Sequence, residues 1–151
     1  MIPKDLSKWI FASVVKHFDD LRDGIHMFVE GESMDSNETH QQYFELRIDG
    51  PYYKNFTRNE YLVKSDINLL CSAVIDGDSH RIHRLAGFIS SLCTTIGIRK
   101  YGADPVIDNG DFISCMNPEA EVKILHFGQI QMKVPLLQAA VRVRYSFNYQ
   151  S

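Results

Sequence analysis

Apolar side chains recur at helical spacing in two stretches of the chain. In the first stretch they are Leu6, Trp9, Ile10, Val14, Phe18 and Leu21. In the second they are Ile82, Leu85, Ala86, Ile89, Leu92, Cys93 and Ile96. Asp5 or Ser7 can cap the first helix and Ser79 the second, while Gly24 and Gly97 are placed to end them. The pattern therefore predicts two amphipathic helices, each with one apolar face.

Apolar and polar residues alternate in most of the remaining chain, which is typical of strands. We expect a short strand over residues 25–29, another over 43–49, and a turn at Asp49-Gly50-Pro51. Further strands are expected over 60–76, 98–101, 112–116, 121–134 and 136–150. The alternation in 121–134 changes phase near Gly128, as a β-bulge would produce.

These elements predict one α+β domain over residues 1–151. Its antiparallel sheet carries extended strands or a β-hairpin arm, and two amphipathic helices pack on one face of the sheet. The pattern shows no internal repeat and no linker that would divide the chain.

The strands over 60–76 and 136–150 are unusually long. At about 3.3 Å per residue each would reach roughly 50 Å, whereas a compact domain of this size is about 40 Å across. A strand that projects as an arm leaves backbone and apolar side chains for another chain to cover. We therefore expect a homo-oligomer held partly by these β-arms, the alternative being strands that break and fold within one domain. The candidate subunit-interface residues are Tyr61, Val63, Arg142, Arg144, Tyr145 and Phe147.

Composition narrows the class of protein. Of 151 residues, 44% are apolar and 23% are charged, and the net charge of −3 argues against a dedicated nucleic-acid binder. The three cysteines, Cys71, Cys93 and Cys115, form neither a disulfide framework nor a CxxC motif. We interpret them as small apolar side chains of a reduced, cytosolic protein. The longest uncharged run is shorter than the roughly 20 residues that span a bilayer, and no signal peptide is visible, so we expect a soluble, unprocessed protein with no membrane partner.

Possible metal ligands are densest at Asp76, Asp78, His80 and His83. A zinc site could use such groups, but an Asp-Gly turn followed by a capped helix with solvated histidines explains them better. Motifs for nucleophilic, nucleotide-binding or zinc-hydrolase chemistry are absent from the sequence. We expect no enzyme and no cofactor. The alternatives are a small metal-dependent enzyme with dispersed catalytic residues and a ligand-binding α+β domain.

The order of elements resembles that of the tail-terminator, or tail-completion, ring proteins of tailed bacteriophages. The resemblance lies in an N-terminal helix (DLSKWIFASVVKHFDDL), a long strand (EYLVKSDINLLCSAVID), a helix that leads into a strand (HRIHRLAGFISSLCTTIGIRKYG) and a closing β-pair (EVKILHFGQI and LQAAVRVRYSFNY). It covers nearly the whole chain. It implies an α+β subunit of a hexameric ring that caps the tail tube and then joins the head, with no catalytic residues to carry over.

The resemblance also implies partners and a location. The partners would be further copies of this chain, the tail tube protein and a neck or connector protein, and DNA would pass through the channel without specific binding. The protein would lie in the virion tail or neck, and in the host cytoplasm during assembly. The acidic segment over residues 30–42 is a candidate channel lining, because its carboxylates would repel DNA phosphates. Its candidate residues are Glu30, Glu32, Asp35 and Glu38.

Overall fold

The computed structural model describes residues 2–30, 40–75, 77–101, 110–130 and 135–150. In chain order the elements are α1 (Leu6–Leu21), β1 (His26–Val29), β2 (Gln42–Asn55), β3 (Glu60–Val74), α2 (Arg81–Ser91), β4 (Ile96–Arg99), β5 (Phe112–Ile130) and β6 (Leu136–Gln150). The strands form one six-stranded sheet in the order β1-β2-β3-β6-β5-β4. Only β1 and β2 run parallel, and the other neighbours are antiparallel. The expected α+β class, with a largely antiparallel sheet, is confirmed.

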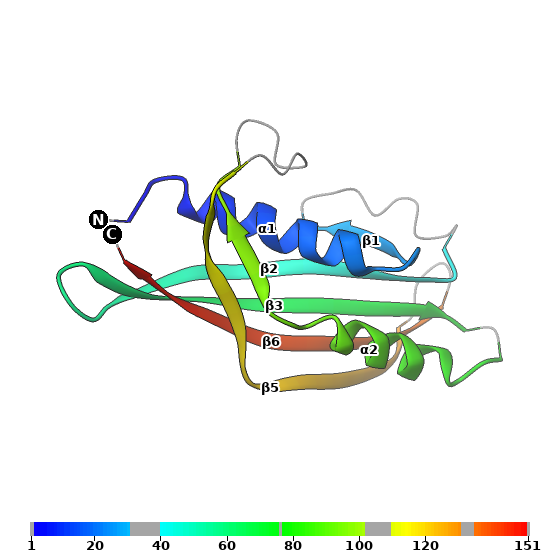
Figure 1. Ribbon diagram of the computed structural model, residues 1–151. Coiled ribbons are helices and arrows are strands. Elements are labelled where there is room, and N and C mark those ends of the chain that lie inside the picture. Colours follow the sequence, from blue (N-terminus) through cyan, green and yellow to red (C-terminus); the bar gives the residue numbers. More distant parts are fainter. Residues whose placement is uncertain (1, 31–39, 76, 102–109, 131–134, 151) are drawn as a thin grey trace.

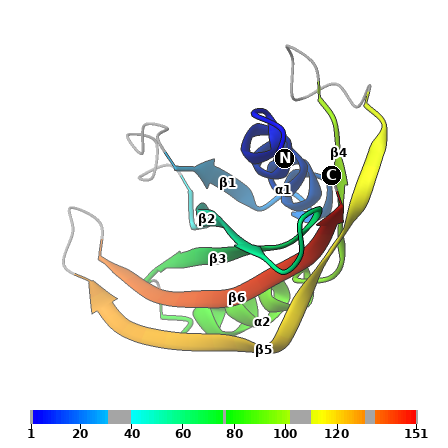
Figure 2. The same ribbon diagram turned by 90° about the vertical axis from the view of Figure 1, so that its left-hand side faces the viewer.

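Both helices pack on the same face of the sheet, as the sequence predicts. Their apolar residues share one core with the residues of β3 and β6 that point to this face. The His17 side chain of α1 hydrogen-bonds the Leu92 carbonyl just after α2, at 2.8 Å. The Trp9 indole N–H donates to the Tyr101 carbonyl at 3.1 Å, which fixes α1 beside the end of β4. The sheet curves so that β1 and β4 lie on either side of α1 (Figure 2).

The two long strands pair with each other over their entire length. Their register runs from Glu60 opposite Gln150 to Val74 opposite Leu136, and β2 pairs with the other side of β3. The expectation that these two strands need a second copy to satisfy their backbone is therefore wrong. What projects is the hairpin end of the sheet, where β2, β3 and the end of β6 run together (Figure 1).

The local predictions from glycine and proline were right for the bulge in β5 and wrong for the turn expected at Gly50 and for the end of the second helix. Gly128 has a φ of 75° at a register shift between β5 and β6, which confirms the predicted bulge. Asp49-Gly50-Pro51 is no turn: β2 continues through a bulge there, with Gly50 at φ 105°, and turns only after residue 55. Gly97 does not end the second helix, contrary to the prediction. The helix ends at Ser91, and Gly97 belongs to β4. The strands expected over 112–116 and 121–134 are one strand, β5, up to Ile130, and residues 131–134 lie outside the described part.

The three cysteines lie in different surroundings. Cys71 and Cys93 are in the core, where burial raises the pKa of each thiol to about 12. Cys115 is exposed on β5, which corrects the expectation that all three act as buried apolar side chains.

We predict that only one thiol reacts quickly in the folded protein. A thiolate is the reactive form, and burial keeps Cys71 and Cys93 protonated and covered. Titration with a disulfide reagent at pH 8 should show one fast thiol, with the other two reacting only on unfolding. Cys115→Ser should remove the fast phase. Two or more fast thiols in the native protein would contradict the described core.

Candidate assembly surface

Among the described residues, no strand covers the outer edge of β5 over most of its length. β4 pairs with β5 only over residues 112–116, and from Asn117 to Ile130 β5 pairs only with β6. Every side chain from residue 121 to 129 is exposed. Four of them are large and apolar: Val122 (37% exposed), Ile124 (40%), Leu125 (39%) and Phe127 (47%). A long apolar edge of this kind pairs readily with another chain, and soluble proteins normally protect such edges.

The side chains of β5 alternate between the two faces of the sheet. Val122 and Ile124 lie opposite Val143 and Val141, which point to the helices. Lys123 and Leu125 lie opposite Arg142 and Ala140, on the face without helices, which we call the open face. Ladder neighbours share a face of the sheet, so the β5 edge offers an apolar pair on the helix side and a mixed surface on the open face.

A second free edge lies on β2. β1 covers only residues 43–46 of β2, and the Glu30 N–H donates to the Leu46 carbonyl as β1 ends. In the described chain no strand lies outside residues 47–55 of β2. This edge and β5 border the sheet on opposite sides, because β1 and β2 come first in the strand order and β5 comes near its other end (Figure 2).

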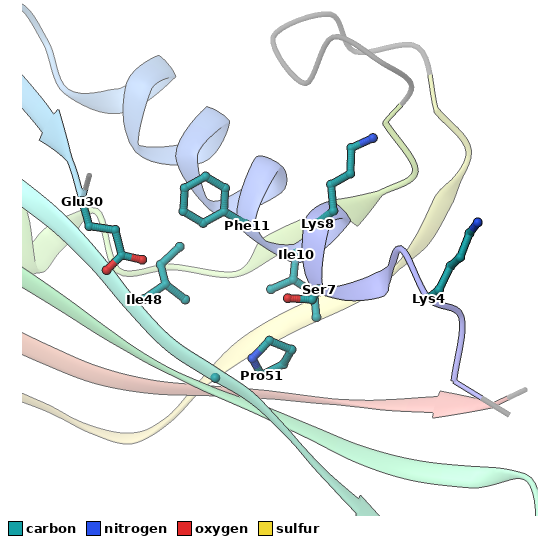
Figure 3. A pocket seen from close by; sticks show the side chains of 9 residues that line it. Lys4, Ser7, Lys8, Ile10, Phe11, Glu30, Ile48 and Pro51 are labelled. Carbon is teal, nitrogen blue, oxygen red and sulfur yellow. The ribbon is translucent and has the colours of Figure 1, made fainter. Parts of the chain in front are cut away.

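A cleft lies beside the first part of this free edge, at residues 48–51 of β2. It has a volume of about 510 Å³ and lies between β2 and the first turns of α1 (Figure 3). The cleft is lined by Lys4, Ser7, Lys8, Ile10, Phe11, Glu30, Ile48, Gly50 and Pro51. Phe11 is 39% exposed and, with Ile48 and Pro51, gives the cleft an apolar floor and wall.

Charges on the open face are separated between its two sides. Near β1 and β2, the carboxylates Glu30, Glu45 and Asp49 lie around Arg47, whose pKa is raised mainly by its hydrogen bond to Glu45. On β6 and β5, Arg142 lies opposite Lys123. Cross-strand pairs of like charge destabilise a sheet, and among the described residues no carboxylate forms an ion pair with either of these two cations.

One ion pair joins β3 and β6 in the middle of the open face. Arg144 donates two hydrogen bonds to Asp66, at 2.6 and 3.1 Å. These bonds lower the pKa of Asp66, because they favour the charged carboxylate. Asp66 also lies opposite Asp49 on β2. Arg144 therefore offsets the repulsion between two neighbouring carboxylates.

The structure separates the predicted interface residues into two groups. Arg142 and Arg144 are exposed on the open face and Tyr61 is half-buried. Val63, Tyr145 and Phe147 belong to the core, so their prediction as subunit-interface residues is wrong. The physical reason is that their phase of β3 and β6 faces the chain's own helices. The Tyr145 hydroxyl, for example, donates to the Thr94 carbonyl at 2.8 Å.

The β5 edge was not predicted from the sequence, although the sequence contained a sign of it. Val122 and Ile124 are on one phase of the strand and Leu125 and Phe127 are on the other, so neither phase is polar. A strand that is apolar on both faces is either central or covered by a partner. Of the predicted acidic segment, Glu30 lines the cleft, and Glu32, Asp35 and Glu38 lie outside the described residues.

The possible metal ligands are not brought together in the described chain. Asp78 accepts the His80 backbone N–H at 3.0 Å and pairs with Arg84, as in a turn that precedes a helix. His83 lies instead beside His126 of β5, with ring centroids 4.4 Å apart. Among the described residues no three histidine, cysteine, aspartate or glutamate side chains gather at one point. Asp76 lies outside these residues.

Comparison with known proteins informs the fold only. No family model matches the chain, and no curated protein matches it. Ten chains among solved structures match its fold. One of them, whose name is a bare sequence identifier, aligns over 93% of this chain and 94% of its own, with a TM-score of 0.54 and 9% sequence identity. At that identity the likeness shows a shared fold and carries no function. None of the described helices has the length and apolar character needed to cross a membrane.

We predict that Arg144→Gln destabilises the protein only where Asp66 is ionised. A carboxyl whose pKa is lowered by folding stabilises the protein above its unfolded pKa of about 3.9, and this stabilisation is lost as the pH falls through the lowered folded value. At pH 7 the variant should be slightly but measurably less stable than the wild type, since solvent screens this exposed pair, and the loss should vanish near pH 2.

Urea unfolding across this pH range measures the difference. The matched control is Arg142→Gln, on the same strand and face, which removes a like-charge neighbour of Lys123 and should cost nothing. An equal loss for Arg144→Gln at pH 7 and pH 2 would contradict the assigned role of Asp66.

Proposed function

We propose that this chain is a structural virion protein: a tail-terminator subunit that forms a homo-oligomeric, hexameric ring. The ring ends the phage tail tube and joins it to the head or neck. The observation that carries this proposal is the exposed edge of β5, with its unpaired backbone and four large apolar side chains. A surface of this kind needs a protein partner, and its chemistry suits assembly better than binding of a small molecule.

The fold is consistent with the proposal. A small α+β subunit with long strands is what the resemblance to tail-terminator proteins implies, and the chain has that architecture. The long strands build a stiff sheet within each copy, and the free edges remain available for contacts between copies. The nearest alternative within the same class is another ring protein of the neck or tail tube.

The remaining partners follow from the position of such a ring. One rim contacts the tail tube protein and the other contacts a neck or connector protein. DNA passes through the central channel without specific binding, in keeping with the net charge of −3. The acidic segment that begins at Glu30 faces this channel in the proposal, where carboxylates repel the phosphates and keep the genome mobile.

We predict that the purified protein forms rings with a central hole, visible by negative-stain electron microscopy. Light scattering should give a mass of about six chains at micromolar concentration. Added to tail tubes that lack their terminator, the protein should cap one end and stop their elongation. A protein that stays monomeric at every concentration would refute ring formation, and rings that ignore tail tubes would favour the neck alternative.

A further inference from the structure

The two free edges of the sheet fit one another. β5 has a free outer edge on one side of the sheet, and β2 has a free outer edge and a cleft on the opposite side. We propose that the β5 edge of one copy enters the cleft of the next copy and pairs antiparallel with residues 47–55 of its β2. The sheet then continues from copy to copy. The inference rests on the proposed function for its occupant, a second copy of this chain.

The backbone supports a strand as the occupant of the cleft. β1 runs along the outer side of β2 but ends at Val29, and the cleft continues on the same side of β2 past Ile48 to Pro51. An added strand there would lie where a longer β1 would have run. Addition of a strand to an open sheet edge is a common mode of protein recognition, because the backbone hydrogen bonds supply affinity.

The apolar side chains lie on matching sides of the sheet. Val122 and Ile124 point to the helix side of β5, where they remain exposed. In a continued sheet they would share a face with Ile48 and meet Phe11 of α1, which is itself exposed beside the cleft. Each partner would thus cover apolar surface that the other leaves open to water.

The charges determine the direction of pairing. Lys123 is on the open face of β5 beside Arg142, and Asp49 is on the open face of β2 beside Asp66. Lys123 and Asp49 therefore each have a cross-strand neighbour of their own charge, positive for Lys123 and negative for Asp49. Placing Lys123 next to Asp49 joins them as opposite charges, which favours this contact over edge-to-edge pairing of two identical strands.

A second pair of charges distinguishes antiparallel from parallel pairing. When Lys123 lies next to Asp49, the antiparallel direction places Lys54 at the level of Pro118 and Glu119, with Glu121 two or three positions closer to Lys123. Glu119 pairs with Lys64 of its own chain at 3.3 Å, and in this register it is the carboxylate nearest to Lys54 of the next copy. The parallel direction would instead bring Lys54 toward Phe127 and Gly128, with no carboxylate.

The contact is head-to-tail, since one surface of each copy meets a different surface of the next. Such heterologous contacts form a closed ring when the rotation between copies closes, and an open filament when it does not. Every copy uses both of its edges in a closed ring. The exposed strand edge of β5 is then covered in all copies.

Reversal of the charges at the contact would test it. Lys123→Glu and Asp49→Lys should each raise the apparent Kd for assembly roughly tenfold, because an opposite-charge contact becomes a like-charge one. The double variant K123E/D49K should restore assembly, and so should an equal mixture of the two single variants. Sedimentation velocity over a concentration series measures all of these. The control K16E/D20K reverses an ion pair on α1 and should assemble like the wild type.

The single variants should remain folded, which circular dichroism can check. Lys123→Glu removes a like-charge neighbour of Arg142. Asp49→Lys removes a like-charge neighbour of Asp66 but also a carboxylate close to Arg47; because Arg47 keeps its hydrogen bond to Glu45, both variants should fold. Single variants that assemble normally, or a double variant that fails to recover, would overturn the proposed contact while leaving the ring intact as a hypothesis. A wild-type protein that never assembles would instead refute the proposed function itself.

Cross-linking tests the geometry directly. In a Cys115→Ser background, Phe11→Cys together with Ile124→Cys should give a covalent ladder of oligomers on oxidation. Each cysteine variant alone should stop at a dimer or stay monomeric, because the proposed contact joins two different positions. A double variant that forms no more oligomer than the single ones would overturn the contact.

Discussion

The pairing of β3 with β6 along their entire length is the constraint on which the rest of this structure depends. Fifteen-residue strands are about three times as long as is usual, and each satisfies one side of the backbone of the other, while β2 and β5 pair with their outer sides. One phase of this pair, including Ile67 and Val143, points to α1 and α2 and forms the core. The position of both helices, and the separation of a packed face from an open face, follow from this one ladder.

The same constraint explains why β5 is left with a free edge. β5 begins beside β4 and then leaves it to follow β6, and β4 is only four residues long. β5 therefore extends far beyond the end of β4. Apolar residues remain on both faces of the uncovered part, where a monomeric protein would be expected to place charges. The fold thus produces a surface suited to assembly as a direct result of unequal strand lengths.

Charge on the open face adds direction to this surface. Carboxylates gather toward β1 and β2, whereas Arg142 and Lys123 lie together on β6 and β5. Arg144 and Asp66 form an ion pair between these two regions. The resulting polarity runs across the strands, from one edge of the sheet to the other. A subunit whose two sheet edges lie near opposite charges is suited to repeated head-to-tail contacts, and contacts of this kind build rings.

The sequence by itself determined both helices, most of the strands, the bulge at Gly128 and the α+β class. These features depend on local periodicity and on residues such as glycine, which allows backbone conformations that other residues avoid. The turn at Gly50 was predicted wrongly because the same residues also suit a bulge, and the pairing of β2 with β3 decided between the two. The function proposed from the order of elements stays a prediction.

Only the tertiary structure decided which chain lies beside each strand. Alternation along β3 and β6 shows that one phase is buried, but it cannot show whether a neighbouring copy or the chain's own helices bury it. Val63, Tyr145 and Phe147 were therefore assigned to a subunit interface, although they lie in the core. The physical reason is that backbone hydrogen bonds between strands are nearly independent of sequence, so the partner of a strand depends on how the whole chain packs.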